Sequence, residues 1–377
     1  MTMNKLHSRF LALDVFRGLT VCFMIIVNTQ GDKTTRFAQV THADWHGFTP
    51  ADWVFPSFLF AVGNALAFVM PKFLNQTTSY FLKKVAKRSA IIFLLGFLMY
   101  WFPFMKWDAT GHLVLKPLSE TRILGVLQRI AIAYFLGSLL VYFSNKKRLY
   151  IVILIILVGY WAILMFLGQA GDPLSIQGNA VYQLDHFLLG DSHMYKVQGI
   201  PFDPEGLLST LPAVVNVVAG YLVGHYILAK GKTYEGLAQL LLVGFSMVLI
   251  SEAWHWVLPM NKRLWTSSFT LYAIGLDCCI LALIMYAVDF KNWTSWTSFF
   301  TVFGKNALFI YLFSELLAIT LKFSRVTCEQ SYFKWLYQTF FQPIGGNVGS
   351  LLFSIIFMLV CWAVGWWLDK KRIYIKV

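Results

Sequence analysis

Long, uninterrupted apolar stretches constrain this chain more than any other feature of its sequence. A helix needs about 20 apolar residues to cross the hydrocarbon core of a membrane, and ten stretches close to that length follow one another. They are too long and too uniformly apolar for the strands of a membrane barrel. We therefore predict an all-α polytopic integral membrane protein, one domain over residues 1–377. The expected transmembrane helices cover residues 11–30, 52–71, 88–104, 122–143, 149–168, 206–228, 236–258, 266–289, 299–321 and 348–368.

Composition supports this class and excludes others. The chain is 58% hydrophobic and 13% charged, with a mean hydropathy of +0.62, far outside the range of soluble domains. The net charge of +13 does not indicate nucleic acid as a partner, because the basic residues fall in short clusters between apolar stretches. The expected surroundings are membrane lipid. The five cysteines, which lie mostly inside apolar stretches, are expected to be core residues rather than disulfides.

Basic clusters predict the orientation. The larger share of the 31 lysines and arginines, including "NKKR" at 145–148 and "DKKR" at 369–372, falls on the side of both termini, and such clusters face the cytoplasm. We expect both termini to be cytoplasmic and the first helix, preceded by Lys5 and Arg9, to be an uncleaved span. The loops around 31–51 and 169–205 then lie outside.

Ionisable and amide side chains inside predicted spans are candidates for function, because they are costly in lipid. Asp14 and Arg17 are three residues apart and therefore lie on one helical face. They form either an ion pair or a site where Arg17 binds an anionic ligand from the cytoplasm. Asn28 ends the same span, either as a cap or as a buried polar group. Gln128 and Arg129 are expected about two turns inside the fourth span.

The ninth predicted span and one loop contain further polar candidates. "FGKNALFIYLFSE" places Lys305, Asn306 and Glu315 within one apolar helix, with Glu315 in the outer half. "FDPEG" places Asp203 and Glu205 before the sixth span, where carboxylates either complement the helix start or hold a cationic substrate.

The stretch "THADWHGFTPADW", residues 41–53, concentrates proton-transfer chemistry in a predicted external loop. A histidine oriented by a carboxylate is the usual carrier of a proton or an acyl group, and His42 can meet Asp52 if the loop folds back. The spacing of His42, Asp44 and His46 does not match a metal site, so no metal is expected. These residues alone do not distinguish an enzyme from a transporter.

Seven motifs in one order resemble the heparan-α-glucosaminide N-acetyltransferase family and its bacterial relatives. They are "ALDVFRGLTVCFMIIVN", "HADWHGFTPADWVFPSFLFAVG", "RILGVLQRIAIAYF", "DHFLLGDSHMYK", "FDPEG", "NKRLW" and "GKNALFIYLFSE". The resemblance implies transfer of an acetyl group from cytoplasmic acetyl-CoA to the amine of a terminal glucosamine on the opposite side. It also implies a homodimer in the plasma membrane, the inner membrane of a bacterium, with the active site facing the periplasm or exterior.

The resemblance assigns roles to individual residues. The family's "HASWNG" histidine corresponds to His42, its asparagine after the first core span to Asn28, and its "AD" aspartate to Asp52; these three are the expected catalytic residues. His46 stands where the animal motif has asparagine. We expect acetyl-CoA to contact Asp14, Arg17, Gln128, Arg129 and Asn306, and the acceptor sugar to contact His46, Asp203, Glu205 and Glu315.

Two other classes of function are less well supported by the sequence. A secondary transporter of sugars or amino sugars would also place polar residues within spans, but such folds commonly contain repeats and paired broken helices, which the sequence does not reveal. A purely structural membrane scaffold explains neither Arg129 nor the histidine-rich loop.

The two loop histidines provide a test of this assignment. We expect His42→Ala to abolish acetyl transfer, whereas His46→Ala changes mainly which acceptors are used. Transfer rates for a panel of amino sugars measure both effects. Loss of all transfer in His46→Ala would mean that the roles within this loop are assigned wrongly.

Overall fold

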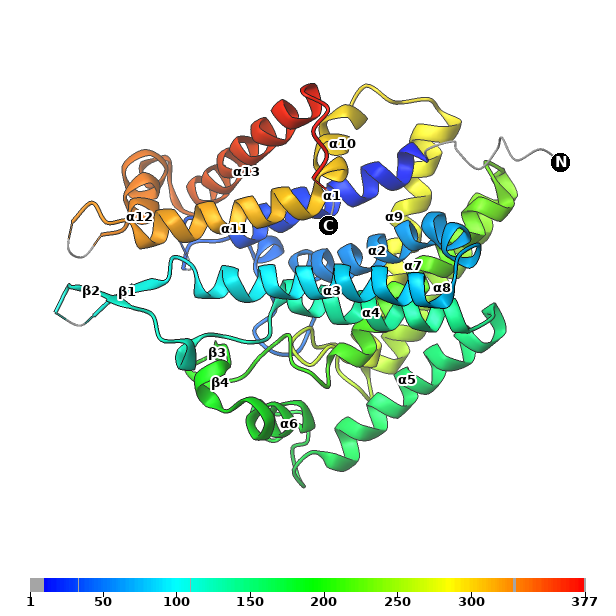
Figure 1. Ribbon diagram of the computed structural model, residues 1–377, viewed down its shortest axis with the longest axis horizontal. Helices are drawn as coiled ribbons and strands as arrows, with labels where there is room; N and C mark the ends of the chain where they lie inside the picture. The colour runs from blue at the N-terminus through cyan, green and yellow to red at the C-terminus, as the bar shows by residue number, and fades with distance from the viewer. Residues whose placement is uncertain (1–9, 33, 109, 328–329, 376–377) are drawn as a thin grey trace.

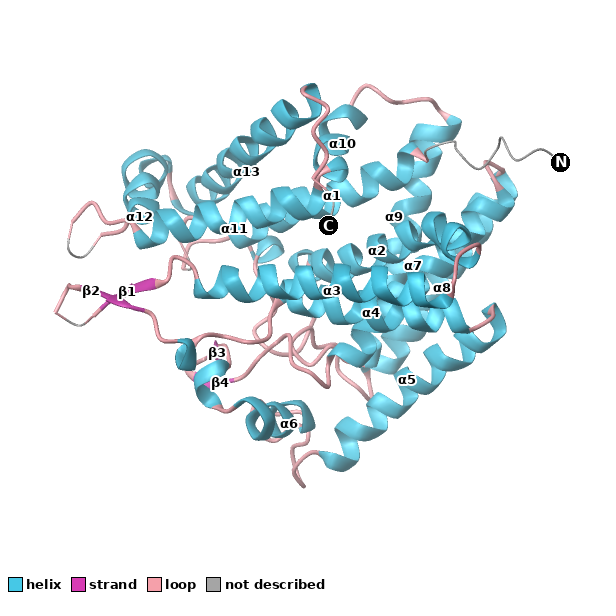
Figure 2. Cartoon of the chain, viewed as in Figure 1, coloured by secondary structure: helices cyan, strands magenta, loops and turns pink. Residues whose placement is uncertain are grey.

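The computed structural model describes residues 10–32, 34–108, 110–327 and 330–375. Lys5, Arg9 and Cys328 therefore lie outside the described residues. The described chain is mostly helical, with two small hairpins as its named strands (Figures 1 and 2). The helices are α1 (Leu11–Asn28), α2 (Pro50–Leu74), α3 (Thr78–Trp101), α4 (Val126–Phe143), α5 (Lys146–Leu167), α6 (Ala180–Leu189), α7 (Thr210–Lys230), α8 (Tyr234–His255), α9 (Ser267–Met285), α10 (Thr297–Lys305), α11 (Ala307–Phe323), α12 (Tyr332–Leu336) and α13 (Gly346–Lys370).

The hairpins and single turns lie in the connections. Strands β1 (Met105–Trp107) and β2 (Leu113–Leu115) pair antiparallel, as do β3 (Lys196–Val197) and β4 (Ile200–Pro201). Short 3-10 or π turns occupy Ala38–Val40, Leu118–Glu120, Asp191–His193, Tyr286–Phe290, Tyr337–Phe341 and Gln342–Ile344.

The predicted polytopic helical class is confirmed by the length and composition of these helices. Among the described residues, eight helices are long and apolar enough to cross a membrane, or up to nine if the pair α10 and α11 counts as one span. The predicted span 88–104 lies mostly in α3, which is not one of these eight because basic residues from Lys83 to Arg88 occupy its first half. The number of ten membrane crossings and the cytoplasmic location of both termini remain predictions.

The ninth predicted span is wrong as a single straight helix. Its two halves, α10 and α11, meet at Asn306 at an angle of 83°. The polar residues at the break bind the end of the chain: the Lys305 ammonium lies 2.6 Å from Asp369 Oδ2, and the Asn306 amide donates to the Ile373 carbonyl and accepts from the Ile375 N–H. The polar groups of Lys305 and Asn306 therefore have their partners in α13 and the residues that follow it, outside the helix that contains Glu315.

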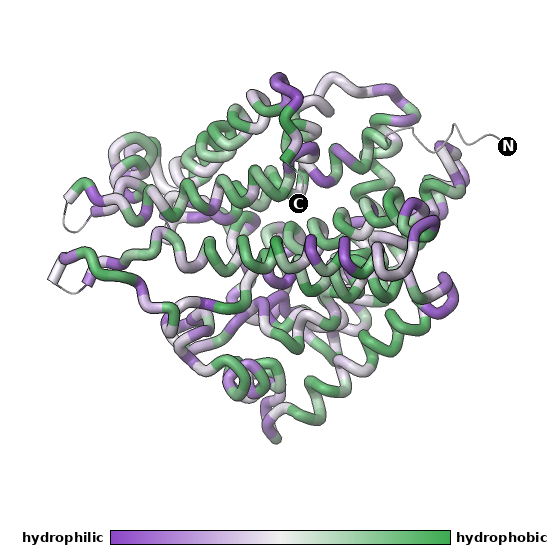
Figure 3. The backbone as a smooth tube through the Cα atoms, viewed as in Figure 1, coloured by the Kyte–Doolittle hydropathy of each residue, from purple (hydrophilic) through white to green (hydrophobic). Residues whose placement is uncertain are grey.

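Burial separates central helices from peripheral ones. In α2, 78% of the most apolar 18 residues are buried inside the protein, whereas only 22% are buried in α5 and 28% in α8. Large apolar side chains on α5 and α8, including Leu154, Ile155 and Phe245, stay exposed. Apolar residues run along most of each helix and polar ones gather in the connections (Figure 3). The exposed faces of α5 and α8 therefore fit contact with lipid.

Glycines allow the central helices α2 and α7 to approach closely. A Cβ added at Gly63 would overlap the Val217 carbonyl oxygen, and one added at Gly220 would overlap the Phe60 carbonyl oxygen. Small residues at such contacts let two helix backbones pack directly, which is common between membrane helices. The two glycines let the backbones of α2 and α7 pack directly against each other.

We expect Gly220→Val to weaken this packing, because overpacking costs about 1–3 kcal/mol. The thermal unfolding midpoint in detergent should fall. Gly159→Ala in α5 is the matched control, since a Cβ there meets nothing within 4 Å and helix propensity favours alanine. A midpoint unchanged in Gly220→Val would contradict direct backbone packing.

Candidate active site

The first turn of α2 is built around the carboxylate of Asp52. Thr49 is the N-cap residue, Pro50 the first helical residue and Asp52 the third, which together form a capping box. Asp52 Oδ2 accepts from Thr49 N–H and from the Thr49 hydroxyl, both at 3.0 Å, and from Ala43 N–H at 3.2 Å. Asp52 is therefore both a cap residue and an anchor for the preceding loop.

His42 completes this arrangement, as predicted. Its Nδ1 lies 2.8 Å from Asp52 Oδ1, so the loop does fold back over the start of α2. If Nδ1–H donates to the carboxylate, Nε2 is left as the basic nitrogen. The side chain remains 38% exposed and lines a cavity.

Lys262 approaches the same imidazole and was missed by the sequence analysis. Its ammonium nitrogen is 3.0 Å from both ring nitrogens of His42 and 3.8 Å from Asp52 Oδ1. Burial, and then the positive charge of Lys262, lower the pKa of His42 below its ordinary value, although Asp52 opposes this. Lys262 therefore favours the neutral, basic form of His42. In the sequence, only its place in the motif "NKRLW" indicated a role for Lys262, because it otherwise looks like any basic residue of an external loop.

Asn28 and Glu315 meet across the bundle. The Asn28 amide donates to Glu315 Oε1 at 2.8 Å, which joins the end of α1 to α11. Asn28 therefore does not serve as a simple cap, and both side chains line the cavity that contains His42.

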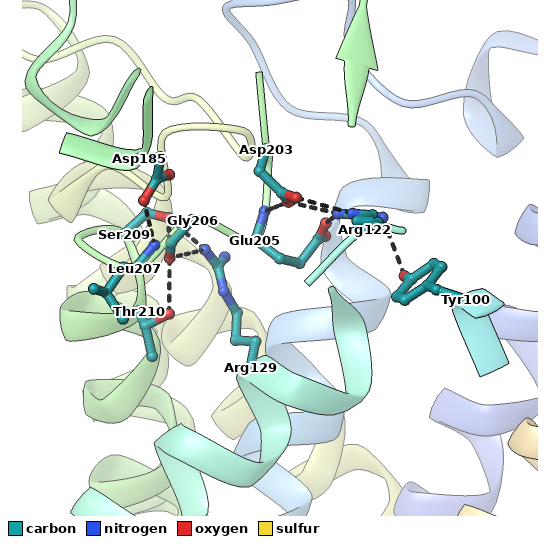
Figure 4. A network of polar contacts seen from close by, with 10 residues as sticks. All are labelled: Tyr100, Arg122, Arg129, Asp185, Asp203, Glu205, Gly206, Leu207, Ser209 and Thr210. Carbon is teal, nitrogen blue, oxygen red and sulfur yellow. Dashed lines mark hydrogen bonds and ion pairs between the residues drawn. The ribbon is translucent and has the colours of Figure 1, made fainter. Parts of the chain in front are cut away.

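Arg122 organises the loop before α7 (Figure 4). Its guanidinium binds Asp203 through Nε at 2.9 Å and through Nη2, and it also pairs with Glu205 and the Tyr100 hydroxyl. Although burial opposes it, the charge of Arg122, with that of other cations, holds the pKa of Glu205 below its ordinary value. Both carboxylates are thus ion-pair partners of Arg122, and Glu205 also lines the cavity. Arg122 was expected inside a span, but it precedes α4.

The expected depth of Gln128 and Arg129 is wrong. Because α4 begins at Val126, both residues lie in its first turn rather than two turns inside. Arg129 donates to the Gly206 carbonyl at 3.1 Å and to the Ser209 hydroxyl, and its guanidinium lies 4.7 Å from the Trp265 ring centroid. Arg129 thereby anchors the chain entering α7. Gln128 is completely buried, and neither amide atom has a hydrogen-bond partner among the described residues.

A cavity of about 430 Å³ collects five predicted site residues: His42, Asp52, Asn28, Glu205 and Glu315. It adds residues that the sequence analysis missed, among them Tyr100, Arg122, Tyr195, Lys262, Arg263 and Tyr311.

The other predicted site residues lie elsewhere. Asp14 and Arg17 form the expected pair at 2.9 Å but are not in the cavity wall, nor are Gln128, Arg129, Asn306 or Asp203. His46 lines a second cavity.

Comparisons with known proteins show the family to which the chain belongs. The family model described as heparan-alpha-glucosaminide N-acetyltransferase, catalytic, matches residues 9–234, more than half of the chain. The chain belongs to this family.

Two curated relatives are similar over most of the chain. The heparan-alpha-glucosaminide N-acetyltransferase of Homo sapiens is 28% identical over 369 residues, covering 83% of this chain and 54% of the human protein. That of Mus musculus is 25% identical over 435 residues, covering all of this chain and 62% of the mouse protein. The chain thus spans less than two thirds of the length of either relative.

Lys262→Met provides a test of the charge that controls His42. Without the Lys262 ammonium the pKa of His42 should rise, so the acidic limb of the pH profile of kcat/KM should move to higher pH. Lys334→Met, an exposed lysine in α12, is the control and should leave the limb in place. An unmoved limb in Lys262→Met would exclude this role.

Proposed function

We propose that this protein is a transmembrane acetyltransferase that moves the acetyl group of cytoplasmic acetyl-CoA to the amine of a terminal glucosamine-type sugar on the extracytoplasmic side. One observation carries the proposal: a buried carboxylate orients His42 at the wall of a cavity of about 430 Å³, in a chain of this family. The acceptor is an amino sugar or a glycan that ends in one.

His42 removes the proton that blocks the reaction. A sugar ammonium must lose a proton before its nitrogen can attack the thioester carbonyl, and neutral His42 accepts it through Nε2. The new C–N bond forms as the C–S bond breaks, and CoA leaves as a thiol after taking a proton. Alternatively, Nε2 attacks first and forms an acetyl-imidazole, which the amine then cleaves. Both routes require unprotonated His42, the form that burial and Lys262 favour.

Charged and amide groups in the cavity supply the remaining needs. Lys262 and the Asn28 amide are the donors available to stabilise the oxyanion that develops on the thioester carbonyl. Glu205 and Glu315 are the carboxylates available to hold the sugar ammonium during binding. Asp52 orients the imidazole through Oδ1, while its Oδ2 continues to accept hydrogen bonds from Ala43 and Thr49.

Buried amides support a passage for acetyl-CoA through the bundle. Asn64 in α2 and Gln128 in α4 are buried, and their amide atoms have no hydrogen-bond partners among the described residues. An unpaired buried amide is costly, and the two amides of a pantetheine arm offer matching donors and acceptors. We propose that Gln128 contacts this arm, and that Arg17, with Asp14, Asn306 and Arg129, contributes to the path from the cytoplasm.

A secondary transporter remains the competing function because of one observation. Bent helix pairs are a feature of transporter binding sites, and α10 and α11 meet at 83°. The polar groups at this bend already bind the end of the chain, which favours the acetyltransferase.

The deciding experiment uses acetyl-labelled CoA and glucosamine with the protein reconstituted in vesicles. We expect the wild type to form N-acetylated sugar, and His42→Ala to lose about 10²-fold or more of the rate. His112→Ala is the matched control, because His112 lies on an exposed turn outside the cavity. Covalent label on wild type that is absent from His42→Ala would indicate the acetyl-imidazole route.

Other results would overturn the proposal. Full activity in His42→Ala would exclude the assigned centre, and uptake of glucosamine without acetylation would favour the transporter. With acetyl-CoA outside the vesicles and the sugar trapped inside, product should form only through those protein molecules whose cytoplasmic face points outward.

A further inference from the structure

The cavity that contains His42 has an apolar side to which the chemistry above assigns no role. Six apolar side chains from three helices line it: Met24 and Val27 of α1, Ala51, Val54 and Phe55 of α2, and Val126 of α4. We call these six residues the apolar floor. All of them except Val126 are buried in the protein.

The apolar floor lies inside the bundle relative to the polar groups of the cavity. Met24 is four residues before Asn28, the last residue of α1, and Phe55 is three residues after Asp52, in the first turn of α2. Residues at these spacings share one face of a helix, and four residues advance the helix by about 6 Å. The polar groups therefore lie toward the loops, and the floor lies one helical turn further into the bundle.

Two residues of the floor are held in place. The Phe55 ring meets the Trp265 ring edge-on, with centroids 5.2 Å apart and planes at 82°. Trp265 is completely buried, and its indole N–H donates to Asn216 Oδ1 at 3.1 Å. Val54 is β-branched and so has one strongly preferred side-chain rotamer in a helix. The floor at Val54 and Phe55 therefore keeps its shape when a ligand enters.

Met24 closes the floor from the opposite helix. Its side chain is unbranched and flexible, and such side chains fill the space that stiffer neighbours leave. It lines the same cavity as Val54 although the two residues belong to different helices. The space between α1 and α2 at this depth is thus limited by one adaptable side chain and one stiff one.

The proposed reaction brings an apolar group to this floor. The reacting carbon of a thioester carries an oxygen, a sulfur and the acyl chain. The oxygen becomes negative and is stabilised by the donors at the polar side, Lys262 and Asn28, where the amine and His42 also meet. The acyl chain is apolar, and it is favoured where it leaves water and packs against apolar side chains.

The chemistry is the same for every acyl length. The C–N bond forms and the C–S bond breaks. Of the two protons that the sugar ammonium loses, one goes to the CoA sulfur and the other is released to water. Donors of different acyl length therefore differ in how the chain fits the cavity, not in the bonds that change.

We propose that Val54 and Met24 are specificity-determining residues that limit the length of the transferred acyl group, so that the floor accepts acetyl and disfavours longer chains. The inference rests on the proposed function and deepens it by naming the residues that select the donor.

The test compares acetyl-CoA, propionyl-CoA and butyryl-CoA, with glucosamine as the acceptor. In the wild type, kcat/KM should fall about tenfold or more for each added methylene, the usual discrimination of a filled apolar pocket. Val54→Ala and Met24→Ala should each raise the ratio of propionyl to acetyl kcat/KM about fivefold or more, because they open space in the floor. Val54→Ile, which adds a methylene, should lower that ratio further.

Two controls separate the floor from general loosening of the bundle. Ile25→Ala is matched to Met24→Ala, and Val21→Ala to Val54→Ala, because both control residues are buried in α1 but do not line the cavity. They remove similar apolar volume and should leave the ratio of the two donors unchanged. Improved use of a longer donor is also a gain that a misfolded variant does not show.

The outcomes distinguish this inference from the proposed function. Equal kcat/KM for the three donors in the wild type, or unchanged ratios in both Val54→Ala and Met24→Ala, would overturn the role of the floor and leave the acetyltransferase intact. Ratios raised as much in Ile25→Ala and Val21→Ala would overturn it as well. Wild-type protein that transfers no acyl group from any of the three donors would overturn the proposed function, and this inference with it.

Discussion

The carboxylate of Asp52 is the group on which the candidate site depends. One oxygen holds His42, and the other accepts hydrogen bonds from Ala43 and Thr49. Because the carboxylate is 1% exposed, each of these bonds replaces one that water would otherwise supply. The start of α2, the course of the loop and the orientation of the imidazole are therefore set by a single side chain.

Charge pairs hold the long connections in place around that centre. Arg122 binds Asp203 and Glu205, and Lys262 lies close to Asp52, so each cation joins its own loop to another segment of the chain. A small apolar cluster that includes Val197, Phe202 and Leu264 packs the same loops against α5. Charge-assisted hydrogen bonds and this cluster together give irregular segments a defined shape.

The helical bundle supplies a rigid base for these loops. Direct packing of α2 on α7 through glycines fixes the helix that carries Asp52 against the helix that follows Glu205. The contact between Asn28 and Glu315 then adds α1 and α11 to the same cavity. Residues far apart in the chain thus face one space because their helices begin or end at the same end of the bundle.

Much of this could be predicted from the sequence, since the evidence was local. Apolar length indicates membrane helices, and a histidine ten residues before an aspartate at a helix start allows the pair seen here. The bend at Asn306 could not be predicted, because it depends on hydrogen bonds with the backbone near Ile373, far along the chain. The start of α4 was misplaced for a related reason. Ile123 and Leu124 extend the apolar stretch toward Arg122, but Arg122 and the Ile123 N–H bind loop residues, Asp203 and His193, instead of beginning the helix.

The sequence by itself determined the class of protein and the chemical types available, and it placed His42 where a folded-back loop allows it to pair with Asp52. Only the tertiary structure decided which of the other polar residues share a cavity with them. It brought in Lys262 and Arg122, and it left Arg17, Arg129 and Asn306 outside. The physical reason is that spacing along one helix or loop predicts local neighbours, whereas a cavity is formed by side chains from many segments, whose positions depend on packing and on long-range ion pairs.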